Sequence, residues 1–364
     1  MDQVIIIGGG VIGLTAAYEL CQAGFRVRVL DQAEPGQEAS WAGAGMIPPG
    51  APGSQPVVLQ QLATESTQLW SELSERLREE TGIDNGYRVC GAVHLATAFE
   101  SLVAQQADWQ AGGVDVELLD HAAVRGLIPP ITESVSHAIH LPRAAQVRNP
   151  WHLLALRTAC ERSGVEILAQ HAVREIVVNQ GRVSKLKTTH GVFRGQQILV
   201  TAGAWSADLL DSVGCSIDIG PVRGQIVLLK SDQPLFRVTL EQGPRYLVMR
   251  EDGHVLIGST EEWVGFEKRN TVAGIAGLCQ FASELIPGLD DLTLQRCWSG
   301  LRPHAPRGLP YVGQVPGLKN LFVAAGHFRA GLSNSPATAR LICDLLLGRE
   351  VNPVYKALGV GRPL

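Results

Sequence analysis

A glycine-rich turn near the N-terminus constrains the fold more than any other feature. The stretch VIIIGGGVIGLTAAYEL begins with the β-branched run 4–7, which is typical of a strand buried on both faces of a parallel sheet. Gly8, Gly10 and Gly13 follow at the start of an expected helix. A second expected strand ends at Asp31, 18 residues after Gly13. The chain therefore begins with a predicted βαβ unit of about 30 residues.

This context is the one that a dinucleotide-binding turn requires. Gly8 permits the tight turn, Gly10 lets a pyrophosphate approach the backbone, and Gly13 lets the helix pack on the strand. The helix N-terminus offers free N–H groups to phosphates, and Asp31 is placed to accept hydrogen bonds from a ribose. The alternative is a glycine-rich turn in another α/β fold.

Two later segments favour FAD over an exchangeable nicotinamide cofactor. Ala202, Gly203 and Trp205 lie in TAGAW, which ends an expected strand. Near the C-terminus, FVAAGHFRAGLSNSP has two glycines, Gly326 and Gly331, where a ligand can approach the backbone. A cofactor contacted at the start, middle and end of a chain is long and buried, as a prosthetic FAD would be.

The remaining elements indicate two interleaved domains. Helical patterns cover residues 57–81 and 98–111, and a third helix is expected after Asn149 as N-cap and Pro150 as first residue. Helices are also expected at 271–286 and from about Ser333. The sequence predicts an α/β fold, with a Rossmann-like FAD-binding domain and a mixed-sheet α+β substrate domain. The first is expected to contain 1–80, 145–220 and 300–364, and the second 81–144 and 221–299.

Composition excludes several classes of protein. The 364 residues carry a net charge of −4 without a cluster of Lys or Arg, so neither nucleic acid nor an anionic membrane is an expected partner. No run of 18 apolar residues predicts a membrane span. The seven cysteines are single, without a C-x-x-C pair, which argues against a disulfide framework or a metal site and favours the cytoplasm.

Six segments in the same order resemble the D-amino-acid oxidase superfamily of flavoenzymes. They are the N-terminal βαβ unit and ASWAGAGM, LVTAGAWS, WSGLRP, GLPYVG and LFVAAGHFRAGLSNSPATA. Within this superfamily the chain is most similar to the glycine oxidase (ThiO-type) family, across nearly its whole length. The resemblance implies a homotetramer and a role in thiamine thiazole biosynthesis. FAD is expected to be non-covalent, because RPHAPRGLPYVG has no cysteine where related sarcosine oxidases attach flavin.

The resemblance also implies a cofactor contact for each matching residue. The turn at Val11 and Ile12 would wrap the pyrophosphate, Asp31 with Gln32 would meet the adenosine, and the Val173 backbone would meet the adenine. Two further groups would line the flavin. One group follows the expected strand that ends at Asp31, and its members are Ala39, Ser40, Ala44, Gly45 and Met46. The other group passes the isoalloxazine edge, and its members are His327, Phe328, Arg329, Ala330, Gly331, Leu332 and Ser333.

For catalysis the resemblance implies that Arg302 holds the substrate carboxylate, Tyr246 assists it, and Arg329 lies near the substrate. Arginine suits the first role because its planar fork binds a carboxylate at two points. An amino acid whose amine is neutral would pass hydride from Cα to flavin N5 without a side-chain base. O2 would reoxidise the flavin and yield H2O2, and the imine would hydrolyse to an oxo acid and ammonia.

The residues alone leave other interpretations open. Arg302 is also interpretable as a surface arginine, Tyr246 as half-buried core, Arg329 as a partner of an acidic group, and His327 as a hydrogen-bonding scaffold. Glu261 stands where glycine oxidases can carry an apolar residue, and Ala330 replaces a residue that is often polar. These departures bear on the substrate more than on the flavin.

The sequence is also compatible with two rival functions. One is a related enzyme, either a D-amino-acid dehydrogenase that passes electrons to a quinone, or a sarcosine or D-proline oxidase. The other is a flavin-binding subunit without turnover. The presence of both Arg302 and Tyr246 argues against the second.

Overall fold

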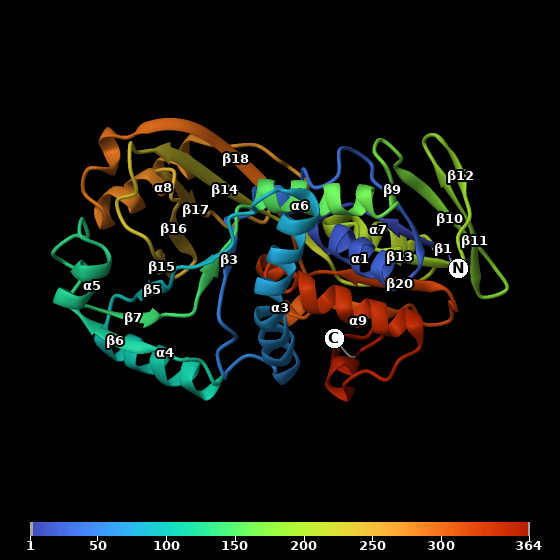
Figure 1. Cartoon of the computed structure of the whole chain (residues 1–364), viewed down its shortest axis with the longest axis horizontal. Helices are drawn as coiled ribbons and strands as arrows, with labels where there is room; N and C mark the ends of the chain where they lie inside the picture. The colour runs from blue at the N-terminus through green and yellow to red at the C-terminus, as the bar shows by residue number, and fades with distance from the viewer. Residues whose placement is uncertain (1–2, 363–364) are drawn as a thin grey trace.

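The computed structural model describes residues 3–362. A six-stranded sheet and an eight-stranded sheet lie next to each other along the long axis of the molecule (Figure 1). The long helix α3 (Val57–Thr81) lies between these two regions in this view and packs against helices of the six-stranded sheet. Within the described range no helix is long and apolar enough to cross a membrane.

The six-stranded sheet is parallel except for one edge strand. The N-terminal strand lies inside it with a partner on each side, which explains its unbroken apolar sequence. Only the first strand in the sheet order is antiparallel to its neighbour. That order is β19 (Tyr311–Gln314), β20 (Leu321–Ala325), β13 (Gln197–Val200), β1 (Gln3–Ile7), β2 (Arg26–Leu30) and β9 (Glu166–Leu168).

Alternate side chains of β1 bury against different layers, as the twofold period of a strand requires. Val4 and Ile6 belong to the core formed with α3 and three further helices, α1 (Val11–Gln22), α6 (Asn149–Arg162) and α9 (Ser335–Leu347). Ile5 and Ile7 pack on the opposite side, where a small antiparallel sheet covers them. Its strands are β10 (Val173–Asn179), β11 (Arg182–Thr188) and β12 (Gly191–Phe193).

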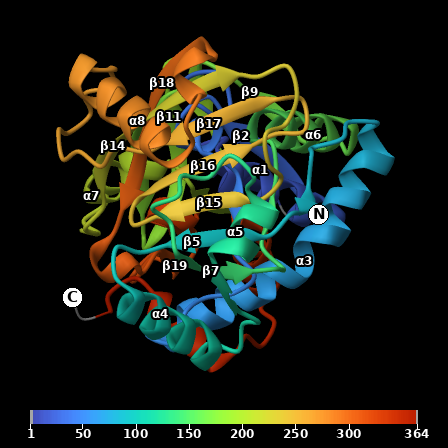
Figure 2. The same ribbon diagram turned by 90° about the vertical axis from the view of Figure 1, so that its left-hand side faces the viewer.

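The eight-stranded sheet is antiparallel apart from the β15–β5 pair. Helix α8 (Val272–Leu285) covers one face, and α4 (Phe99–Ala111) and α5 (His121–Leu127) lie at the end formed by β6 and β7 (Figure 2). The strand order is β18 (Thr293–His304), β14 (Gly220–Lys230), β17 (His254–Gly258), β16 (Arg245–Met249), β15 (Thr239–Gln242), β5 (Ala92–Leu95), β7 (His137–Leu141) and β6 (Glu117–Asp120).

Short elements connect the two large sheets. A small sheet joins segments from three parts of the chain, and two short helices follow β2 and β13. The strands are β3 (Met46–Ile47), β8 (Ala145–Gln146) and β4 (Arg88–Val89), and the helices are α2 (Ala39–Ala42) and α7 (Ser206–Asp211).

The fold corrects two local predictions. Asn149 is not the N-cap of α6: it is the first helical residue, and its side chain instead donates to Ser40 O at 2.6 Å. Helix α9 begins at Ser335 rather than Ser333, because residues 331–334 form turns before it. The strands of the six-stranded sheet all fall in the segments expected for the FAD-binding domain, whereas β18 crosses the expected boundary at residue 300. The domain division itself stays a prediction.

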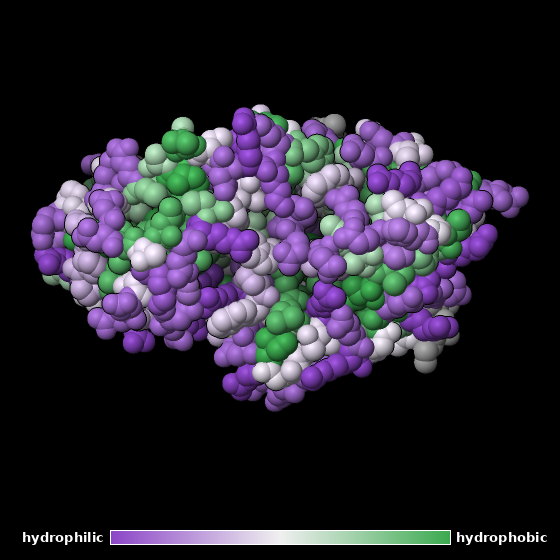
Figure 3. Space-filling model, turned by 90° about the horizontal axis from the view of Figure 1, so that it is seen from above, coloured by the Kyte–Doolittle hydropathy of each residue, from purple (hydrophilic) through white to green (hydrophobic). Residues whose placement is uncertain are grey.

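The surface seen from above is mainly polar, with apolar residues gathered in separate small patches (Figure 3). This pattern is ordinary for a folded domain, in which apolar atoms still contribute much of the exposed area.

Candidate active site

A cavity of about 970 Å³ is lined by residues from both large sheets. Its wall includes the glycine turn after β1, the segment before β3, the turn after β13, strand β16, and the segment after β20. Every residue that the sequence predicts for the site lines this cavity, except Gly13. The fold therefore brings together positions that are up to 325 residues apart, from Gly8 to Ser333.

The glycine turn has no room for side chains. Gly8 has a φ of 107°, and a Cβ there would lie 2.6 Å from Thr201 O. A Cβ on Gly13 would lie 2.0 Å from Gly8 O, so this glycine shapes the turn from behind instead of lining the cavity. Helix α1 begins at the cavity, where Gly10 offers no side-chain cap and the Val11 N–H donates to Ser40 Oγ at 2.9 Å. The N–H groups of the first turn beyond Val11 are left for a ligand.

Asp31 stands at the carboxyl end of β2 and lines the cavity. Its Oδ2 accepts from the Gly9 N–H at 2.7 Å, and its Oδ1 accepts from the Ala33 N–H at 2.9 Å. Burial raises the pKa of this carboxyl despite these two bonds. Because the backbone fixes both oxygens, the remaining lone pairs have defined directions toward a ribose.

Sequence analysis did not identify the residues that hold the segment before β3. Arg250 is buried, and its guanidinium donates to Ala44 O at 2.7 Å and to Val147 O at 3.1 Å. Burial lowers its pKa to about 9. Gly45 approaches the same carbonyl so closely that a Cβ would lie 1.9 Å from Val147 O. No local sequence motif marks Arg250, because its hydrogen-bond partners are remote in sequence.

Arg302 and Tyr246 meet at Ser259. The Arg302 guanidinium donates to Ser259 Oγ at 2.6 Å and to Thr260 O at 3.2 Å, and the Tyr246 hydroxyl also bonds Ser259. Burial lowers the pKa of Arg302, which disfavours the charged guanidinium, and raises the pKa of Tyr246, which favours the neutral hydroxyl. Within residues 3–362, Arg302 forms no ion pair with a carboxylate.

Two glycines make space for these side chains. A Cβ on Gly224 would lie 2.1 Å from Arg302 Nη2, and a Cβ on Gly258 would lie 2.2 Å from Tyr246 Cζ. The sequence motif GST contains Gly258 and Ser259, but its pattern does not reveal that the serine contacts both predicted residues.

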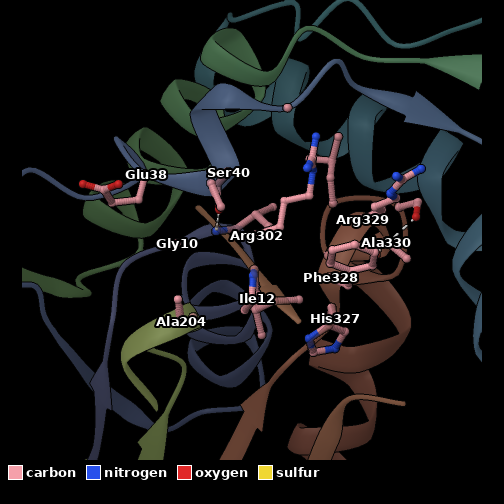
Figure 4. Close-up of a pocket in the computed structure, with 18 of the residues that line it drawn as sticks. Gly10, Ile12, Glu38, Ser40, Ala204, Arg302, His327, Phe328, Arg329 and Ala330 are labelled. Carbon is pink, nitrogen blue, oxygen red and sulfur yellow. Dashed lines mark hydrogen bonds between the residues drawn. The ribbon is translucent and has the colours of Figure 1, made fainter. Parts of the chain in front are cut away.

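Arg329 lines the cavity on the segment that also carries His327, Phe328 and Ala330 (Figure 4). Its guanidinium pairs with the Glu261 carboxylate, and the two side chains are 41% and 35% exposed. This geometry favours the interpretation of Arg329 as the partner of an acidic group. The arginine also compensates the negative charge that Glu261 brings to this loop.

His327 is buried, and its Nε2 lies 3.1 Å from Thr338 Oγ1. Burial lowers its pKa to about 4, so the ring is neutral at pH 7. A neutral, buried ring bonded to helix α9 fits the interpretation of a scaffold better than that of a proton donor.

The cavity fits FAD on its own geometry. An uncapped helix N-terminus with a glycine turn suits a pyrophosphate, a fixed carboxylate suits a ribose, and the glycine-lined segments leave room for a flat ring system. The second sheet adds a half-buried cation, Arg302, without an ion-paired carboxylate among the described residues. Fold and cavity together define a dinucleotide-dependent oxidoreductase.

Comparison with known proteins identifies the family. The family model described as "FAD dependent oxidoreductase" (DAO) matches residues 3–345. Glycine oxidase from Pseudomonas putida is 36% identical over 350 residues, covering 96% of this chain and 95% of that protein. The bifunctional protein ThiO/ThiG from Synechocystis is 34% identical, covering 99% of this chain and 54% of that protein. The crystal structure of glycine oxidase from Geobacillus kaustophilus matches with a TM-score of 0.94 and 32% identity, with 100% of both chains covered.

The chain therefore belongs to the DAO family of FAD-dependent oxidoreductases. FAD is its cofactor, as the sequence predicts.

Proposed function

We propose that this protein oxidises glycine and other small amino acids by oxidative deamination, with O2 as the electron acceptor. The observation that carries the proposal is the Arg302 guanidinium, which lines the cavity beside Tyr246 without an ion pair among residues 3–362. Such a cation favours an incoming carboxylate. The glycine oxidases to which the chain is similar support the choice of amino acid.

In this proposal Arg302 binds the substrate carboxylate, Ser259 holds the guanidinium in place, and the neutral Tyr246 hydroxyl adds a hydrogen bond. These contacts fix the carboxylate end of the substrate, so its Cα–H has a defined direction in the cavity. Bound FAD supplies the acceptor for the hydride and the route of the electrons to O2. Arg329 stays near the substrate as the partner of Glu261.

The cofactor contacts are proposed as the sequence predicts them. The helix α1 N-terminus would hold the pyrophosphate, and Asp31 with Gln32 and Val173 the adenosine. The residues proposed for the flavin ring are those of segments 39–46, 202–205 and 327–333 that line the cavity. No group of three or more His, Cys, Asp and Glu that could hold a metal occurs in the described part of the chain.

We further propose a role in thiamine thiazole biosynthesis and a cytoplasmic location. The similarity to the ThiO/ThiG protein over 99% of this chain supports the first. The seven unpaired cysteines support the second, since a reducing compartment keeps thiols free. The homotetramer stays a prediction from the resemblance.

The test is reduction of the holoenzyme by a substrate panel without O2. Glycine, sarcosine, D-alanine and D-phenylalanine are mixed with the anaerobic protein, and the visible absorbance of the flavin is followed. We expect glycine and the other small amino acids to bleach the flavin faster than D-phenylalanine, and air to restore the colour with release of H2O2. Bleaching without peroxide on admission of air, or no bleaching by any small amino acid, would contradict the proposal.

A further inference from the structure

One row of residues crosses the eight-stranded sheet on the face that lines the cavity. Tyr246 of β16 pairs with Gly258 of β17 on one side and with Glu241 of β15 on the other. Glu241 in turn pairs with His94 of β5. Directly paired residues point to the same face of a sheet, so His94, Glu241 and Tyr246 share one face. All three line the cavity that holds Arg302.

The opposite face of the sheet is separate and apolar. Leu240 and Leu247, the sequence neighbours of Glu241 and Tyr246, belong to the core that α8 covers. The neighbouring cation, Arg245, is also part of the cavity wall, but its guanidinium is turned to the opposite side: it donates to Gly277 O and lies 5.5 Å from the Phe281 ring. Arg245 therefore does not neutralise Glu241 across the cavity.

Glu241 and His94 contact each other inside the cavity. Glu241 Oε1 lies 3.5 Å from His94 Nε2, and the side chains are 28% and 16% exposed. The His94 ring also packs edge-on against Trp109, which lines the same cavity. A carboxylate with one histidine contact keeps lone pairs for another N–H donor.

Strand spacing separates this pair from the carboxylate anchor. Arg302 bonds Ser259 and Thr260, which follow directly after β17. Glu241 is on β15, two strands away, and neighbouring strands are 4.7–4.9 Å apart, so the backbones at these two positions are about 10 Å apart. A glycine molecule spans less than about 4 Å. This spacing suits an amino acid with a chain of several carbons better than glycine for contact with both side chains.

We propose that Glu241, positioned by His94, forms a second substrate subsite that binds an ammonium or another N–H donor at the far end of a longer amino acid. The proposal rests on the function proposed above, since it takes Arg302 as the carboxylate anchor. The enzyme then accepts glycine without using Glu241. Among longer substrates it selects those whose side chain or N-substituent ends in a cation.

The test compares lysine with norleucine, whose side chain has nearly the same length but carries no charge. Both enantiomers of each, and glycine, are assayed for kcat/KM with the holoenzyme and with the Glu241→Gln variant. For the enantiomer that is oxidised, wild type should favour lysine over norleucine at least about tenfold. Glu241→Gln should lower kcat/KM for lysine roughly 10- to 100-fold, the effect of losing one charge-assisted hydrogen bond, and leave glycine within about twofold.

Glu117→Gln is the matched control. Glu117 also pairs with a histidine of the same sheet, His140 at 3.0 Å, but neither residue lines the cavity. This variant should leave kcat/KM for both lysine and glycine unchanged. Equal rates for lysine and norleucine in wild type, or an unchanged ratio in Glu241→Gln, would overturn the subsite.

Binding is measured in parallel, so that the two proposals can fail separately. Lysine and norleucine are mixed separately with the anaerobic holoenzyme at increasing concentrations. The concentration dependence of the rate of flavin bleaching, or of the spectral shift where no bleaching occurs, gives their affinities. A lysine preference that disappears in Glu241→Gln, with glycine not oxidised, supports the subsite and rejects the proposed reaction. Oxidation of glycine without any lysine preference in binding rejects the subsite alone.

Discussion

Arg302 is a cation whose hydrogen-bond acceptors in the cavity are neutral. A serine hydroxyl and a backbone carbonyl accept from it, and burial lowers its pKa. Two neutral acceptors orient the guanidinium but leave its charge uncompensated, which is costly in a site partly closed to water. A carboxylate that enters the cavity relieves this cost, so the same contacts that position the arginine also favour the substrate.

Replacement of Arg302 by alanine should lower kcat/KM for glycine on the order of 10² to 10⁴-fold, because the substrate loses both its charge partner and its orientation. Arg302→Lys should recover only part of this, since a point charge cannot reproduce the fork. Steady-state kinetics give the values, and the flavin absorbance shows whether FAD is retained. Arg296→Ala on the same strand, where the side chain is exposed, is the control. A loss of less than about twofold in Arg302→Ala would show that the anchor lies elsewhere.

His327 predicts a pH dependence of stability. Its pKa is about 4 in the folded protein and about 6.5 when unfolded, so the folded state binds fewer protons between these values. Stability from the neutral ring is therefore present above about pH 6.5 and is lost as the pH falls toward 4. Between pH 7.5 and 5 the loss should be about 2 kcal/mol.

Urea unfolding of wild type and His327→Gln at these two pH values isolates this contribution. Glutamine can still bond Thr338 but does not titrate. The drop in the free energy of unfolding should be smaller in the variant by about 2 kcal/mol. Other titrating groups, including His152 and Asp31, are present in both proteins, so their contributions cancel in the difference between the two drops. Equal drops would mean that the ring is already protonated or is exposed.

At the scale of elements, the turn between β1 and α1 depends on glycine at a position that does not line the cavity. Gly13→Ala would place a Cβ 2.0 Å from Gly8 O, so the turn must move. We expect a loss of about 1–3 kcal/mol in the free energy of unfolding and a lower FAD content after dialysis. Denaturant titration and flavin absorbance measure the two effects.

Gly277→Ala provides the comparison for this change, since it is also a glycine-to-alanine substitution within a helix. A Cβ there meets nothing within 4 Å, so helix propensity alone should act and stabilise the protein by about 0.5–1 kcal/mol. If Gly13→Ala behaved like Gly277→Ala and kept its FAD, the close packing of α1 on the turn would not matter for the cofactor.

Local patterns predict some elements well and others not at all. The sequence predicts the β1–α1–β2 unit and the bounds of α3, because caps, glycines and periodicity within each segment determine them. It does not predict β18, whose residues include arginine, glycine and proline and which is held by its pairing along β14. Asn149 is a good N-cap by type, yet a contact with the distant Ser40 overrides that preference. Ser259, Arg250 and Glu241 are missed for the same reason: their partners are remote in sequence.

At the scale of the whole molecule, the cavity wall needs both large sheets. The N-terminus of α1 and Asp31 adjoin strands of the six-stranded sheet, whereas Tyr246 and Arg302 lie on strands of the eight-stranded sheet. A ligand that contacts residues of both sheets stabilises only the folded arrangement. FAD should therefore act as a stabilising ligand for the entire chain, beyond its part in the chemistry.

Removal of FAD should lower the thermal stability, and its return should restore it in proportion to the logarithm of its concentration. At 100 times its Kd, FAD should add about 2.7 kcal/mol to the free energy of unfolding, which for a chain of this length is a rise in Tm on the order of 4 °C. Thermal melts of the apoprotein with increasing FAD measure this.

ADP is the control ligand, because it offers the phosphates and the adenosine but no flavin ring for the segments that follow β13 and β20. Mass action requires ADP and FAD to raise the stability equally when each is present at the same multiple of its own Kd. The comparison therefore rests on the two Kd values. If FAD binds no more tightly than ADP, the segments around the flavin contribute no binding energy, and the assignment of residues 327–333 to the ring must be abandoned.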